Sequence, residues 1–228
     1  NLGIAAGGTV MEDCRVLEAC REGKYTSVLV QTHDKKYVEY RTEHFVNALG
    51  SGAGKLCDSM GIDAGLYPVR HQAFITRRLP MLGKHGTNLD MLIDRQDYKG
   101  FSAVYGQQIA YTGQIIGCAS PKLDAMRIDK NLKVNTKAFL EIVSEMFSEW
   151  IPDLAGVGIQ AVWAGYYTEP RYIVDPELGL FVGMRGHGFM LSQYIARMYV
   201  DKLLGRPVPE YFEKLKLNGP GLSEKAFK

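Results

Sequence analysis

The sequence predicts an α/β fold, in which part of a mixed sheet with helices is joined to an antiparallel-sheet lobe. Three observations lead to this prediction. The first 50 residues alternate β-branched segments with short turns, and residues 66–120 hold strands at hairpin spacing. An apolar strand at 180–182 then runs through a glycine-rich turn into a long helix. We expect three segments, at residues 1–65, 66–134 and 135–228.

The composition is that of an ordinary globular protein. The 228 residues suffice for one sizeable core, with 46% hydrophobic and 23% charged residues. A net charge of +2 gives no footprint for nucleic acid, and we expect neither a transmembrane segment nor a signal peptide. Cys14, Cys20, Cys57 and Cys118 show no metal-ligand spacing. We therefore expect reduced thiols, no metal site and a cytoplasmic location.

The first segment predicts a β-meander followed by one more strand and a helix. Four stretches combine alternation with β-branched or apolar residues and are predicted strands: residues 9–19, 25–32, 36–41 and 44–49. The last of these is expected to be buried. Residues 21–24 are predicted as a turn, and a helix ending at Met60 is closed by Gly61.

The second segment predicts an antiparallel sheet. Its expected strands are residues 67–76, 91–94, 101–105 and 110–118. Gly100 and Gly106 occupy natural turn positions between them. Asn135 then precedes a helix with one apolar face, which Pro152 ends, and residues 157–165 return as a strand.

Residues 178–205 carry the most information about function. The apolar strand is followed by Gly183, Gly186 and Gly188, and apolar residues then recur at helical spacing as far as Gly205. The start of such a helix presents free backbone N–H groups and a positive dipole end to an electron-rich partner. An ordinary tight strand–helix turn is the alternative interpretation.

The turn resembles the C-terminal flavin signature of the D-amino-acid oxidase superfamily, with the glycine oxidase and sarcosine oxidase branches nearest. The resemblance implies FAD as cofactor. It makes residues 1–65 the central part of the FAD-binding domain, residues 66–134 an antiparallel substrate lobe, and residues 135–228 a helix and the return to the FAD-binding domain. It places the turn beside the isoalloxazine ring. The implied cofactor-binding residues are Gly183, Met184, Arg185, Gly186, His187, Gly188, Phe189 and Met190.

Two further matches extend the implied cofactor site. Residues 47–50, Asn-Ala-Leu-Gly, resemble the strand end that lies over the dinucleotide in the family, which makes Ala48 and Gly50 candidates. Val16 aligns with the strand that borders the adenine, where its backbone would form hydrogen bonds. A plain sheet position is the alternative for Val16.

The resemblance also implies a reaction, the oxidation of the C–N bond of a small amine or amino acid by hydride transfer to the flavin. Tyr105 resembles the tyrosine that covers the substrate, and Tyr167 stands four residues after Trp163, where the family places a substrate-binding side chain. With His187 they are the candidate catalytic residues. The alternatives are sheet tyrosines with hydroxyls in water and a histidine that caps the helix.

Charged residues near these positions allow two interpretations each. Arg171 is either the cation for a substrate carboxylate or an arginine that is at the surface or ion-paired. Arg185 either stabilises the reduced flavin or pairs with a carboxylate. Ile115 and Met190 stand where the sarcosine oxidase branch carries lysines, so the resemblance favours a dehydrogenase with another electron acceptor over a sarcosine oxidase.

The sequence contains no G-x-G-x-x-G turn for the pyrophosphate and opens with Asn1. We therefore expect a fragment, a processed piece or one subunit of a split enzyme. Its partner would be the missing N-terminal FAD-binding segment or another subunit. One alternative is a non-catalytic subunit or fragment that does not bind FAD alone. The other is an unrelated α/β binding module with a chance glycine turn.

Overall fold

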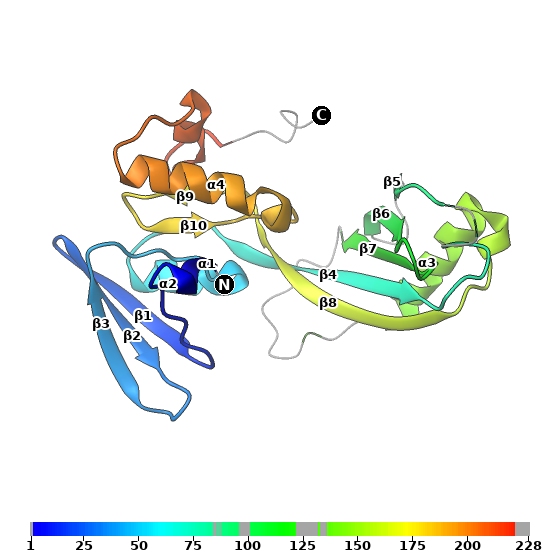
Figure 1. Ribbon diagram of the computed structural model, residues 1–228, viewed down its shortest axis with the longest axis horizontal. Coiled ribbons are helices and arrows are strands. Elements are labelled where there is room, and N and C mark those ends of the chain that lie inside the picture. The colour runs from blue at the N-terminus through cyan, green and yellow to red at the C-terminus, as the bar shows by residue number, and fades with distance from the viewer. Residues whose placement is uncertain are drawn as a thin grey trace. The chain divides into compact units, whose positions relative to one another are not determined.

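The computed structural model describes residues 2–83, 86, 88–95, 101–121, 132 and 136–221, and the chain divides into two compact units (Figure 1). Unit 1 comprises Asn1–Leu66 and Thr168–Lys228, and unit 2 comprises Tyr67–Tyr167. Both contain helices packed on antiparallel strands, which confirms the predicted α/β class. Within the described segments, no helix combines the length and the apolar character needed to cross a bilayer.

Unit 1 begins with the short helix α1 and a three-stranded meander. Its N-terminal elements are α1 (Leu2–Ala5), β1 (Arg15–Glu22), β2 (Tyr25–Gln31), β3 (Tyr37–Thr42), the 3-10 helix η1 (Gly50–Gly52) and α2 (Ala53–Ser59). Its C-terminal elements are β9 (Ile173–Asp175), β10 (Leu180–Val182), α4 (Gly188–Leu203) and the 3-10 helix η3 (Glu210–Leu215).

The meander is antiparallel in the order β1-β2-β3, and Ala19, Val28 and Val30 pack with Leu56 of α2. The strand expected from residue 9 begins only at Arg15, because Asp13 has a φ of 53° that extended backbone does not allow. The strand then continues to Glu22, so the predicted turn at 21–24 is confined to its last two residues.

The prediction of a buried strand at residues 44–49 is wrong. Only Asn47 forms a bridge, parallel to Leu180, with its N–H 2.8 Å from the carbonyl oxygen of Gly179. Val46 and Leu49 are each 45% exposed. Of the apolar side chains of this stretch only Phe45 packs against a core, the cluster that contains Leu56. Two backbone hydrogen bonds of Asn47, to Gly179 and Phe181, replace the expected strand.

The pair β9–β10 forms a buried layer between two helices (Figure 1). On one face Ile173, Leu180 and Val182 pack with residues of α2, and on the other Val174 packs with residues of α4 and η3. Alternate side chains of a strand point to opposite faces, so even three-residue strands serve both helices. The core of unit 1 fixes β10 and, with it, the turn into α4.

Unit 2 is a five-stranded sheet with one long helix. Its elements are β4 (Tyr67–Thr76), β5 (Leu92–Asp94), β6 (Phe101–Gln108), β7 (Ile115–Pro121), α3 (Thr136–Trp150), the 3-10 helix η2 (Pro152–Leu154) and β8 (Ile159–Glu169), whose last two residues belong to unit 1. The strand order is β5-β6-β7-β4-β8, and the pairs from β5 to β4 are antiparallel.

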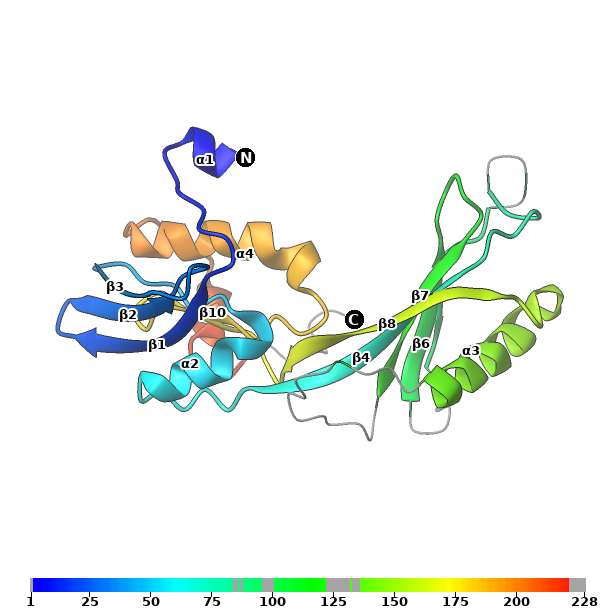
Figure 2. The same ribbon diagram turned by 90° about the horizontal axis from the view of Figure 1, so that it is seen from below.

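Helix α3 lies along one face of this sheet (Figure 2). Its apolar side is buried, as its spacing predicts, against Phe74, Val104, Ile115 and Ala119; the helical members are Phe139, Ile142, Val143, Met146 and Phe147. Strand β4 alternates between buried and half-buried residues. The half-buried residues, His71 among them, belong to the face that α3 does not cover.

Several turn predictions in unit 2 need correction. Gly106 lies inside β6, where an added Cβ would come 3.1 Å from Cγ2 of Ile115, so close strand packing and not a turn requires glycine. The strand predicted from residue 110 begins only at Ile115, after Gly113 with a φ of 66°. Gly100 and Asn135 lie outside the described residues. The strand predicted at 157–165 runs as β8 to Glu169.

Gly179→Ala should destabilise unit 1 more than Gly61→Ala. Both glycines have a φ close to +70°, which costs an L-residue about 1–2 kcal/mol. A Cβ at Gly61 meets open space, whereas one at Gly179 would lie 2.5 Å from the carbonyl oxygen of Phe45. We expect roughly 1–3 kcal/mol of additional loss for Gly179→Ala in urea unfolding. Equal losses in the two variants would contradict this packing argument.

Candidate functional site

The turn between β10 and α4 requires glycine at its start. Gly183 has a φ of 70°, and a Cβ there would overlap the carbonyl oxygen of Arg171. Two residues later Arg185 adopts a φ of 50°, which is uncommon for a residue other than glycine. Its N–H donates to the carbonyl oxygen of Thr168 at 3.3 Å. The backbone path of the turn is therefore fixed by local contacts.

The start of α4 is open. The N–H of Leu191 makes the first helical bond, 3.0 Å from the carbonyl oxygen of His187, so the amides of residues 188–190 precede the intrahelical ladder. The side chain of Phe189 is 99% exposed and that of Met190 is 69% exposed. Neither is folded into the core, and the helix start offers donors and a positive dipole end to a partner.

The side chain of His187 is engaged beside this turn. Its Nδ1 lies 2.5 Å from the hydroxyl oxygen of Tyr172, and the side chain makes no capping hydrogen bond to α4. His187 thus occupies the N-cap position of α4, as the alternative interpretation has it, but its side chain does not form a capping hydrogen bond. Because one ring nitrogen is held by Tyr172, the orientation of the imidazole beside the turn is set.

Arg185 and Arg171, the two arginines considered from the sequence, both bind groups within unit 1. Nε of Arg185 lies 2.6 Å from Oε2 of Glu169, and both side chains are largely sheltered from solvent, so the ion-pair interpretation describes Arg185. Arg171 donates to the backbone carbonyl oxygens of Leu217 and, at 2.8 Å, of Gly219. The guanidinium of Arg171 thus ties the C-terminal part of unit 1 to the strand region.

The loop at residues 47–50 lies beside β10. Asn47 is buried; its Nδ2 donates to the carbonyl oxygen of Ala53 at 3.0 Å, and its Oδ1 accepts from the N–H of Leu49 at 3.3 Å. These bonds shape the loop that carries Ala48 and Gly50, and Gly50 has a φ of 55° with open space at its Cβ position. The loop and the turn at 183–187 therefore flank the same short strand.

Val16 belongs to the meander and not to the β10 layer. It pairs with Val30 beside a bulge in β1 and packs, together with Phe45, on the cluster that contains Leu56. The contact of both Val16 and Phe45 with this cluster connects β1 to the beginning of the 45–50 segment.

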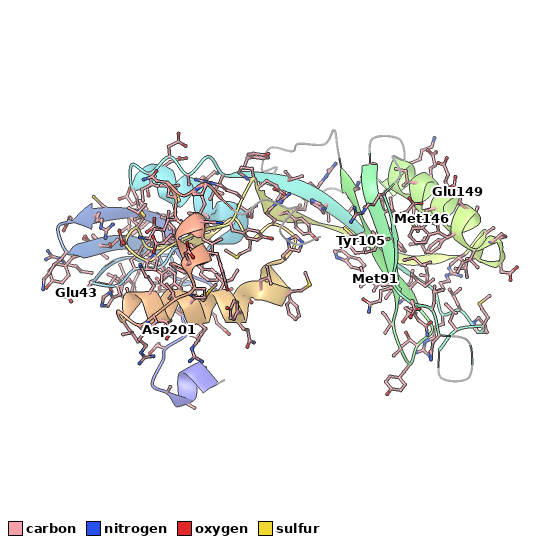
Figure 3. All side chains as sticks on the ribbon, turned by 90° about the horizontal axis from the view of Figure 1, so that it is seen from above. Glu43, Met91, Tyr105, Met146, Glu149 and Asp201 are labelled. Atoms are coloured by element: carbon pink, nitrogen blue, oxygen red, sulfur yellow. The ribbon has the colours of Figure 1, made fainter. Side chains whose placement is uncertain are left out.

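The two candidate tyrosines meet in unit 2. The hydroxyl of Tyr105 lies close enough to the hydroxyl of Tyr167 and to the thiol of Cys118 to interact with both. Burial raises the pKa of both phenols, so both remain protonated donors at neutral pH. Figure 3 labels Tyr105 on the sheet and Met146 on α3. The alternative of sheet tyrosines with hydroxyls in water does not describe this pair.

His71 and Cys118 also belong to this site, although their sequence pattern predicts no such role for either. The imidazole of His71 stacks on the ring of Tyr167 with 3.7 Å between centroids and 27° between planes. Burial lowers the pKa of His71 to about 4 and raises that of Cys118 to about 11, so both side chains are neutral. The register that places Cys118 opposite Tyr105 cannot be read from hydrophobic alternation alone.

The cysteines and the potential metal-binding side chains of the described residues form no disulfide and no metal site. All four cysteines are free. Among the residues that the structure describes, no three His, Cys, Asp or Glu side chains are grouped so that they could hold a metal ion.

The ion pair of Arg185 should be strongly coupled. A double-mutant cycle with Arg185→Met and Glu169→Gln should give a coupling energy of about 1–2 kcal/mol in urea unfolding, because both side chains are sheltered. The control is Lys24–Glu43, a pair at 2.8 Å whose side chains are 70% and 52% exposed. We expect a much smaller coupling there. Similar values for both pairs would overturn the argument from burial.

His71 should make the stability of the protein sensitive to acid. Its folded pKa of about 4 lies below the unfolded value near 6.5, so the unfolded chain binds the proton first. Stability should therefore fall by roughly 2–3 kcal/mol as the pH drops from about 6.5 towards 4. His71→Phe should remove this part of the pH dependence in urea unfolding curves. His33→Phe, at an exposed turn, reports the general effect of replacing a histidine.

Comparison with solved structures finds the same fold in proteins named as oxidases and as a dehydrogenase. Glycine oxidase from Geobacillus kaustophilus matches with a TM-score of 0.69 and 18% identity, over 94% of this chain and 54% of that chain. L-proline dehydrogenase from P. horikoshii matches with a TM-score of 0.69 and 25% identity, over 94% of this chain and 58% of that chain. Iminodiacetate oxidase from Chelativorans sp. BNC1 matches with a TM-score of 0.68 and 15% identity, over 97% of this chain and 57% of that chain.

The chain thus spans little more than half the length of these proteins. No curated protein matches the sequence. The model of the DAO family, described as FAD dependent oxidoreductase, matches residues 2–202. That match covers most of the chain and agrees with the shared fold, so the protein belongs to the DAO family of FAD-dependent oxidoreductases.

Proposed function

We propose that this chain carries part of the flavin site and part of the substrate site of an enzyme that oxidises the C–N bond of a small amine or amino acid. Membership of an FAD-dependent oxidoreductase family supports the redox class. The similar structures are named for glycine, L-proline and iminodiacetate, which supports the C–N bond as the bond that is oxidised. The observation that carries the proposal is the open start of α4, held at the end of buried β10.

The residues present fit one edge of a flavin. The amides of residues 188–190 precede the helical ladder, and the glycine backbone of the turn permits close approach. FAD, when bound, supplies the ring that accepts a hydride. The residues that would hold it are those of the turn from Gly183 to Met190, with Ala48 and Gly50 on the adjoining loop and Val16 on β1. A segment or subunit with a pyrophosphate-binding turn would complete the site.

In unit 2, Tyr105 and Tyr167 would orient the substrate. Both phenols are neutral and partly accessible, so each can offer an apolar ring face and the pair can donate a hydrogen bond to a ligand. In unit 1, His187 is held by Tyr172 beside the turn and would contact the flavin or the substrate.

We favour a dehydrogenase over an oxidase, but one of the two positions on which this preference rests, Ile115, needs correction. Ile115, matched to a family lysine, is buried on the α3 side of the sheet and does not share the face of Tyr105. The nearest positions of β7 on that face are Ile116 and Cys118, and neither carries a charge.

A cytoplasmic location stays a prediction.

The absorption spectrum tests the cofactor. The protein, purified with any chain that accompanies it, should show a flavin band of one FAD per chain, and an amine or amino acid should bleach it under anaerobic conditions. Absence of the band from the intact complex would exclude this function. Recovery of FAD only when a second chain is present would identify the non-catalytic-fragment alternative for the isolated chain.

Phe189→Asp tests the helix start. A carboxylate at this fully exposed position should not disturb the fold, but it would oppose negative charge on a reduced flavin placed at the amides of 188–190. The flavin midpoint potential should become more negative. Gln193→Asp, exposed one turn further along α4, is the matched control and should change the potential less. Equal shifts would contradict the placement of the flavin.

A further inference from the structure

The face of the five-stranded sheet opposite α3 carries a cluster drawn from four strands. His71 comes from β4, Tyr105 from β6, Cys118 from β7 and Tyr167 from β8. Cys118 stands directly opposite both Tyr105 and Ala73 in the antiparallel pairs, and directly opposed residues share a face. His71 lies two residues from Ala73 on the same strand. The register therefore brings side chains from distant parts of the sequence together.

His71 is joined to this cluster by ring stacking. Its imidazole lies 3.7 Å from the ring of Tyr167, and its Nδ1 is buried without a hydrogen-bond partner among the described residues. A buried imidazole with no partner on Nδ1 is costly to charge, so it persists as a neutral flat ring. Stacking against this ring restricts the rotation of the Tyr167 side chain and so fixes its hydroxyl near Tyr105.

Among the described residues, the strand partners of Tyr105 on β5 and of Cys118 on β4 are uncharged. The residues paired with its members on this face are apolar: Ala73 opposite Cys118, and Ile93 opposite Tyr105. Ile116, two residues before Cys118, is apolar as well. A carboxylate requires a cation or several donors when it leaves water. Two phenols, a thiol and a neutral imidazole suit the hydrocarbon part of a ligand better than an anion.

We propose that His71 is a substrate-positioning residue, and that the neutral face it forms with Tyr105, Cys118 and Tyr167 receives the hydrocarbon side of an amine and not a carboxylate. This inference rests on the proposed function and narrows its substrate class. His71 acts through Tyr167: the stacked ring holds the phenol that contacts the ligand. The substrate class is therefore an amine whose hydrocarbon part is apolar and uncharged.

Two matched pairs of compounds test the class. Pyrrolidine and proline, and phenethylamine and phenylalanine, differ by a carboxylate alone. With the FAD-loaded protein and any chain that accompanies it, each amine should half-saturate flavin reduction at a concentration at least tenfold lower than its amino acid. Tighter binding or faster reduction by the amino acids would overturn the inference while leaving the proposed function intact.

Three substitutions of His71 separate stacking from charge. His71→Phe keeps a neutral stacked ring and should stay within about threefold of the unsubstituted protein for both pairs. His71→Ala removes the ring and should raise the half-saturation concentration of the amines at least tenfold with little change in the limiting rate. His71→Arg retains a planar group that stacks on tyrosine but adds a cation, and should shift the preference at least tenfold towards the amino acids.

An NMR titration provides a readout independent of turnover. The imidazole signals of His71, assigned by their loss in His71→Phe, should shift when pyrrolidine or phenethylamine is added and should shift less with proline or phenylalanine. No shift with either amine would overturn the inference. Flavin that none of the four compounds reduces would instead count against the proposed function, and the titration would still decide the role of this face.

Discussion

The burial of the β9–β10 pair between two helices is the constraint on which the candidate flavin site depends. Ile173, Leu180 and Val182 face α2, whereas Val174 faces α4. Since β10 is only three residues long, its position comes from this packing on both faces and not from an extended hydrogen-bond ladder. The turn at 183–187 leaves this strand directly, and the loop at 47–50 is bonded to it through Asn47. Loss of the layer would release both segments.

Charge is distributed differently in the two units. In unit 1 the cations near the turn have local partners: Arg185 pairs with Glu169, and Arg171 donates hydrogen bonds to backbone carbonyl oxygens. In unit 2 the cluster around Tyr105 achieves neutrality by burial, which keeps phenols and thiol protonated and the imidazole uncharged. Binding in unit 1 would therefore depend on backbone dipoles, and binding in unit 2 on ring faces and neutral donors.

The sequence predicted the elements whose signals are local. The strand at 180–182, its glycine turn and α4 follow from an apolar run, three glycines and helical spacing, and all three are confirmed. The buried strand at 44–49 was wrong, because alternation does not reveal whether a partner strand lies alongside. Gly106 was assigned to a turn because the sequence does not show that Ile115 packs against it. The sequence does not show the register between β6 and β7. That register decides which face of the sheet Ile115 and Cys118 each occupy.

The conformation of Arg185 suggests why the turn keeps its shape. A φ of 50° in a residue other than glycine is uncommon and costs roughly 1–2 kcal/mol, and such strain persists only when surrounding contacts determine it. Here the N–H of Arg185 bonds to Thr168 and its side chain pairs with Glu169, so two adjacent residues at the end of β8 hold one residue of the turn. Gly183 is required a step earlier, where any side chain would overlap Arg171. The backbone that leads to the amides of α4 is thus held from the strand side, and a ligand at those amides would meet donors already in place.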